Sequence, residues 1–194
     1  VDKICPMILF AERQDALSYI TPFIEHFQFS ANSYQLFSQL ITVEDRYPHY
    51  ENFWYIWDQF FEKISDLSGN IDRNRDARET IKYYLLAYPY WPPGTTEWHS
   101  IRGKERLFYD KVVSKMGHAS VVLYSIAKVL NDVCSQFALD GVTWLSSMII
   151  TNKYIELERY TIEYIEKFIR RFILIKRQNV KRDKELRDKV ICIL

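Results

Sequence analysis

Apolar residues recur along most of the chain at spacings of three and four, the period of one helix face. The clearest case is ENFWYIWDQFFEKISDLSG, residues 51–69. Its stripe consists of Phe53, Trp57, Phe60, Ile64 and Leu67. Gly69 follows the last apolar position, where a helix commonly has its C-terminal cap. We therefore predict an amphipathic helix that ends at this glycine.

Three further stretches in the first half of the chain show the same period. Residues 5–27 predict one or two helices, with Thr21-Pro22 able to start the second. Residues 30–48 predict a helix that is capped by Ser30 or Asn32 and ends before Pro48. Residues 73–88 predict a helix whose apolar positions are Ile81, Leu85 and Tyr88.

The second half of the chain continues in the same way. Residues 119–141 predict a helix that ends at Gly141, with Val122, Ile126, Leu130, Val133 and Phe137 as its apolar positions. Residues 142–150 predict a short helix. Residues 154–176 predict a long one, with Leu157, Tyr164, Phe168, Phe172 and Ile175 on one face. Residues 183–194 begin another.

The pattern as a whole favours an all-α fold with about eight or nine helices. The chain contains only five Gly and six Pro, fewer than an all-β protein of this length would use in its turns. Short connections place neighbouring helices antiparallel, so we expect an irregular α-solenoid or a helical bundle. In length and spacing, YENFWYIWDQFFEKI (50–64) and YTIEYIEKFIRRFI (160–173) resemble the helices of HEAT or armadillo-like repeats. The resemblance implies stacked helices that serve as a scaffold.

The 194 residues are expected to form a single all-helical domain over residues 1–194, with a sub-boundary near residues 89–95. The chain starts with Val and ends in the apolar KVICIL, so we expect it to be part of a larger protein. Its three cysteines, Cys5, Cys134 and Cys192, form no C-x-x-C pair, which favours reduced thiols in a cytoplasmic protein. No apolar run approaches 18 residues, so no membrane partner is expected.

Recognisable catalytic motifs are absent from the sequence. Gly103-Lys104 lacks the remainder of a phosphate-binding loop, and no G-x-S-x-G occurs. The four histidines, His26, His49, His99 and His118, include no pair at helical metal-ligand spacing. We therefore expect no cofactor and no metal, and lean towards a non-catalytic protein. An enzyme whose site is assembled from distant residues stays open as an alternative.

The aromatic stretch YPYWPPGTTEWHSIRGKER, residues 88–106, is the first candidate for recognition. Helix signals explain most of it as a rigid crossover: a stop before Pro89, a stiff turn and a restart at Thr95 or Thr96. Exposed Trp and Arg are typical of interface hot spots. If this stretch binds a partner, the predicted contact residues are Trp91, Trp98, His99 and Arg102.

A basic stretch near the end of the chain is the second candidate. Residues 167–189 contain ten Lys or Arg and three Asp or Glu, a balance of +7 in a chain whose formal net charge is +1. Cations at a helix C-terminus also interact favourably with its dipole, so an ordinary basic helix end is one reading. The other is a surface for a polyanion. Its candidate residues are Arg170, Arg171, Lys176, Arg177, Lys181 and Arg182.

These features favour a non-catalytic helical scaffold or an interaction and sensor module of a larger cytoplasmic protein. Its expected partner is another protein or the remaining domains of the parent chain. By fold-level analogy, such helical arms occur at the C-terminus of large bacterial NTPases, including defence proteins. A nucleic-acid-binding module that uses residues 167–189 is the less favoured alternative.

Overall fold

The computed structural model of the protein describes residues 13–42, 50–87, 98–133, 137–152 and 157–194. Within these ranges the chain forms nine α-helices and one 3-10 helix, and it contains no strand. The prediction of an all-α fold with about eight or nine helices is therefore confirmed. Contacts divide the chain into two compact units, Val1–Trp91 and Pro92–Leu194, which are described separately below. A single domain over residues 1–194, with a sub-boundary near 89–95, stays a prediction.

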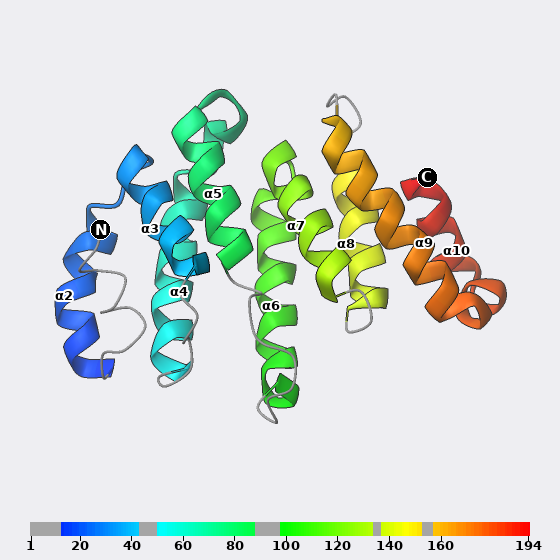
Figure 1. The fold of residues 1–194 in the computed structure, drawn as a ribbon, viewed down its shortest axis with the longest axis horizontal. Coiled ribbons are helices and arrows are strands. Elements are labelled where there is room, and N and C mark those ends of the chain that lie inside the picture. Colours follow the sequence, from blue (N-terminus) through cyan, green and yellow to red (C-terminus); the bar gives the residue numbers. More distant parts are fainter. Residues whose placement is uncertain (1–12, 43–49, 88–97, 134–136, 153–156) are drawn as a thin grey trace. The chain divides into compact units, whose positions relative to one another are not determined.

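The described residues of the first unit form four α-helices and the 3-10 helix, and Figure 1 shows the α-helices. In chain order these are α2 (Arg13–Glu25), α3 (Ala31–Thr42), α4 (Tyr50–Asp66), η1 (Ser68–Arg73) and α5 (Arg75–Ala87). The most extensive packing joins second neighbours in the chain, with α2 against α4 and α3 against α5. This alternation makes two layers, each built from every second helix.

Aromatic rings fill the core of this unit. The rings of Trp57 and Tyr84 stack with their centroids 4.5 Å apart, and the Tyr84 hydroxyl donates to the Trp57 carbonyl at 2.8 Å. Phe37 meets Phe60 edge to face at 5.3 Å. Trp57, Phe60 and Ile64 are fully buried, so the stripe predicted in residues 51–69 faces the core at these three positions.

The ends of the helices in this unit differ from two predictions. Helix α4 ends at Asp66, and Gly69 lies inside η1 instead of capping α4, because the chain continues in the tighter turns of a 3-10 helix. Leu67 is consequently exposed. Residues 13–25 form one helix with Pro22 inside it, so no second helix starts at Thr21-Pro22. Pro22 lies three residues before the end of α2, and because proline has no N–H, α2 lacks the hydrogen bond that this position would otherwise donate to the Ser18 carbonyl.

Side-chain hydrogen bonds show which residue caps α3, where Ser30 or Asn32 was predicted, and which caps α5, where no cap was predicted. The Ser30 hydroxyl accepts a hydrogen bond from the backbone N–H of Ser33 at 3.4 Å, so Ser30 and not Asn32 caps α3. Asn74 caps α5, since its side-chain oxygen accepts from the N–H groups of Asp76 and Ala77.

In the second unit, the residues that the structure describes form five α-helices (Figure 1). They are α6 (Trp98–Met116), α7 (Ser120–Val133), α8 (Ala138–Thr151), α9 (Arg159–Arg182) and α10 (Lys184–Ile193). Here too the most extensive packing skips one helix: α7 lies against α9, and α8 against α10. Helix α6 also packs on α8. The helices of this unit thus form one layer of α6, α8 and α10 and another of α7 and α9.

Polar contacts fix α6 against α8. The side-chain amide of Asn152, just after α8, donates to the Gly117 carbonyl at the end of α6 at 2.6 Å. The Trp144 indole N–H donates to the Asp110 carboxylate at 2.7 Å.

Among the described residues, no helix is both long and apolar enough to cross a lipid bilayer.

Gly141 does not end a helix, which corrects the prediction for residues 119–141. It lies in the first turn of α8, while α7 ends at Val133. A Cβ atom on Gly141 would come within 2.7 Å of a Leu130 methyl carbon and 2.8 Å of the Phe168 ring. Glycine is therefore needed here because α7, α8 and α9 approach closely, and a packing requirement produced what looked like a stop signal in the sequence.

Candidate functional site

The aromatic candidate can be located only in part. Trp91 lies outside the described residues. Trp98, His99 and Arg102 belong to the first turns of α6, and the structure describes the backbone there but not these side chains. Their role as partner contacts stays a prediction.

The first half of α9, residues 159–172, packs against the rest of the second unit through a buried face. Its buried residues are Thr161, Ile165, Phe168, Ile169 and Phe172. Polar contacts reinforce this packing on α7. The Asn131 amide donates to the Tyr164 carbonyl at 2.7 Å, and the Tyr124 and Tyr164 rings meet edge to face.

The second half of α9, residues 173–182, contains no buried residue. Three consecutive bulky residues, Ile173, Leu174 and Ile175, are exposed, and Leu174 at 80% is the most exposed large apolar residue that the structure describes. The prediction that Ile175 shares the inward face is therefore wrong. The helix also kinks at Lys176, where φ is −113° and ψ is 23°. Phe172 is the last buried residue of α9, and the kink at Lys176 follows about one turn later.

The end of α7 explains where this burial stops. The Arg171 guanidinium donates to the Asn131 carbonyl, two residues before α7 ends at Val133. Beyond Arg171, α9 continues past the described end of its main neighbour. Phe172 is still fully buried, whereas Ile173, Leu174 and Ile175 after it are exposed.

The six candidate cations fall into three groups. Arg171 is occupied at the end of α7, where it satisfies a terminal carbonyl, so its role is structural. Arg170 lies 3.9 Å from Glu166 on the exposed side of α9, a weak pair at that distance and exposure. In the part of the chain that the structure describes, the other four take part in no ion pair: Lys176, Arg177, Lys181 and Arg182.

By helical period, four exposed residues of α9 fall on the side opposite its buried face, with the kink at Lys176 between the second and the third of them. Arg170, Leu174, Arg177 and Lys181 follow one another at spacings of four, three and four, and all are exposed. We call these four residues the basic row. At 1.5 Å per residue it is about 16 Å long. From Lys167 to Arg182 the helix holds no acidic residue.

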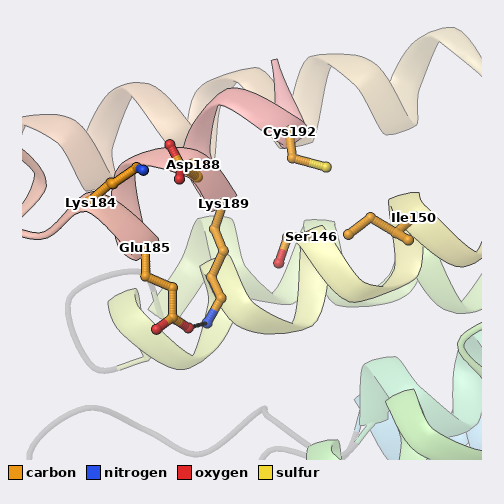
Figure 2. Close-up of a pocket in the computed structure, with 7 residues that line it drawn as sticks. All are labelled: Ser146, Ile150, Lys184, Glu185, Asp188, Lys189 and Cys192. Atoms are coloured by element: carbon orange, nitrogen blue, oxygen red, sulfur yellow. Dashed lines mark ion pairs between the residues drawn. The ribbon is translucent and has the colours of Figure 1, made fainter.

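A second feature of this unit is a groove between α8 and α10, with a volume of about 550 Å³ (Figure 2). Ser146 and Ile150 of α8 form one side. The α10 side consists of Lys184, Glu185, Asp188, Lys189 and Cys192. Lys189 and Glu185 form an ion pair at 2.8 Å across one turn of α10, as Figure 2 shows.

The groove holds no recognisable catalytic pair. The Ser146 hydroxyl donates to the Thr143 carbonyl, and no histidine lines the groove to serve as its base. The Cys192 thiol is exposed. Within the described ranges, no group of three or more His, Cys, Asp or Glu side chains is arranged to hold a metal ion. Two lysines face two carboxylates around the groove, so its charges balance.

The pattern of the sequence did not reveal these features. Leu174 is marked out by its exposure, and Asn131 by its position at the end of α7; neither property is visible in a periodic pattern. Comparison with known proteins adds no assignment: no family model and no curated protein matches the chain.

Proposed function

We propose that the chain is a non-catalytic helical interaction module with a scaffold of the helical-repeat type. Support for the scaffold comes from packing within each unit, where helices contact their second neighbours and build two layers. In helical repeats, equivalent helices of successive repeats stack in this way, and the layers present long surfaces for partners.

The observation that carries the interaction role is the second half of α9. Residues 173–182, in a helix that is kinked at Lys176, include no buried side chain, although three of them are bulky and apolar. Apolar side chains that lie next to exposed cations and contribute nothing to a core are typical of a binding surface. We place the candidate contact at the basic row.

Peptide selection on the purified chain tests this proposal. Random peptides of about 16 residues, long enough to span the row as a helix, are displayed on phage and selected on the wild-type chain. We expect enriched peptides that lose binding to a Leu174→Asp variant. Leu107→Asp is the matched control, because Leu107 is a 63% exposed leucine on α6. No enrichment, or equal binding to all three proteins, would contradict an interaction site at α9.

A nucleic-acid-binding module is the second candidate, and one observation favours it. Lys176, Arg177, Lys181 and Arg182 are free of ion pairs within the described ranges, so they are available to phosphates. Binding of single-stranded and duplex DNA and RNA oligonucleotides is measured over a range of salt concentrations. Four phosphate contacts would give a slope of about −3 to −4 in log K against log salt. Absence of binding at low salt would remove this candidate.

A further inference from the structure

Resting on the proposed interaction function, we propose that the basic row docks an acidic amphipathic helix of a protein partner. The row is formed by Arg170, Leu174, Arg177 and Lys181. Its partner would carry carboxylates opposite the three cations and a bulky apolar side chain against Leu174.

The charge of this surface requires an acidic partner. Arg177 and Lys181 are one turn apart on the same face, where two like charges repel each other. Lys176 and Arg182 add two more cations to the same ten residues. Arg187 of α10 donates to the Lys181 carbonyl at 3.4 Å and brings a further positive charge to this end of the helix. Carboxylates from a partner would relieve this repulsion. They would also form charge-assisted hydrogen bonds with Arg170 and Arg177, the two arginines of the row.

The apolar member of the row favours a protein over a nucleic acid. Leu174 lies between Arg170 and Arg177 and is 80% exposed. A phosphate backbone offers no apolar surface to cover it. Single-stranded nucleic acids are commonly held by aromatic side chains on which bases stack, and the row contains none. A helix with a leucine or an aromatic residue on one face covers Leu174 and supplies carboxylates beside it.

A lipid surface fits the row less well. Ile173, Leu174 and Ile175 are consecutive on a helix, so they point about 100° apart, and a flat bilayer surface meets only one of these directions. One exposed leucine per row provides little insertion, since interfacial helices bind through a continuous apolar face.

The first half of α9 restricts the partner's position. The half-buried Glu163, paired with Arg159 at 3.0 Å, and the exposed Glu166, 3.9 Å from Arg170, precede the row on the same helix. Carboxylates of a partner would be repelled there, because like charges across an interface are unfavourable. The acidic segment is thereby confined to the stretch from Arg170 to Lys181.

The peptides selected on the wild-type chain test this inference through their composition. We expect them to be richer in Asp and Glu than the starting library, with at least one bulky apolar residue one turn from an acidic one. Their affinity is then measured for Leu174→Gln, for Arg177→Glu and for the control pair Leu107→Gln and Lys111→Glu. Leu107 and Lys111 are an exposed leucine and lysine one turn apart on α6.

Each α9 change should weaken binding about tenfold or more, and the α6 pair should leave it unchanged. Thermal unfolding confirms that the variants are folded. If the selected peptides need Leu174 but are neutral or basic, the proposal of an acidic partner is wrong. The proposal that α9 is an interaction site would still hold. Peptides insensitive to every α9 change, or none at all, would overturn both. Binding of oligonucleotides or anionic vesicles that survives Leu174→Gln but not Arg177→Glu would assign the row to those ligands instead.

Discussion

The two halves of α9 carry bulky apolar residues at similar density, yet they behave differently. In the first half, Phe168 and Phe172 are fully buried. In the second half, Ile173, Leu174 and Ile175 are all exposed. The two halves join without a break between Phe172 and Ile173, and the kink at Lys176 lies within the second half. The first half buries one face and packs on α7, whereas the second half, which Arg187 of α10 reaches at the Lys181 carbonyl, has no buried residue.

This difference shows that apolar character alone does not assign a residue to the core. The first half stabilises the fold because α7 covers it, whereas the second half adds helix and charge without adding core. A segment that contributes little to stability is free to change its contacts, which a binding surface requires. The following predictions test the contrast, from the largest expected effect to the smallest.

Removal of a side chain from the buried half should have the largest effect. Phe172→Ala is expected to lower the free energy of unfolding by about 3–5 kcal/mol, because a fully buried ring leaves a cavity. Ile175→Ala is the matched change in the exposed half and should cost about 0.5 kcal/mol or less. Urea unfolding measures both. Equal losses would show that the two halves are packed alike.

A methyl group at the meeting point of α7, α8 and α9 should have the next largest effect. Gly141→Ala places a Cβ atom within 2.8 Å of the Phe168 ring, and such overpacking costs about 1–3 kcal/mol. Gly69→Ala is the control, since nothing lies within 4 Å of a Cβ atom there. Thermal unfolding of both variants makes the comparison, and an unchanged melting temperature for Gly141→Ala would refute the close approach.

Two arginines near the boundary between the halves should differ in their effect on stability. Arg171→Ala removes the donor to the Asn131 carbonyl and should cost about 1 kcal/mol, since the group is partly exposed to water. Arg177→Ala should change stability by about 0.5 kcal/mol or less. Urea unfolding is again the measurement. A larger loss of unfolding free energy for Arg177→Ala than for Arg171→Ala would contradict the structural role of Arg171.

The smallest effect concerns the groove between α8 and α10. Glu185→Gln removes the ion pair with Lys189 and should cost about 0.3–0.5 kcal/mol, as expected for an exposed pair one turn apart on a helix. The difference from wild type in thermal unfolding should shrink at high salt, because salt screens exposed charges. A difference that is unaffected by salt would mean that Glu185 acts through packing.

The sequence was sufficient for the features that depend on local pattern. The helical period predicted the all-α class, and it placed Trp57, Phe60 and Ile64 in the core of α4. It failed where a distant neighbour decides. The apolar run through Ile175 continues the period of α9, but burial stops where α7 ends. Gly141 resembled a helix stop because close packing and a helix cap both select glycine.

The candidate site was predictable only as a charge imbalance. Counting residues identified the basic stretch, but not that Arg171 is used to hold α7 while Arg177 and Lys181 face outward. That division depends on which carbonyl each side chain reaches, and therefore on the tertiary structure. Leu174 falls opposite the predicted stripe of Phe168 and Phe172, but the period alone does not tell whether another helix covers it.

The most direct test measures the stability of a variant in which three side chains of the basic row, all in the second half of α9, are replaced. Leu174→Gln, Arg177→Gln and Lys181→Gln are combined, and urea unfolding is measured against wild type. Because these side chains contribute no core and no ion pair among the described residues, we predict a change in the free energy of unfolding of about 1 kcal/mol or less. A loss of about 3 kcal/mol or more, comparable to that of a core residue, would show that this half of α9 holds the fold together.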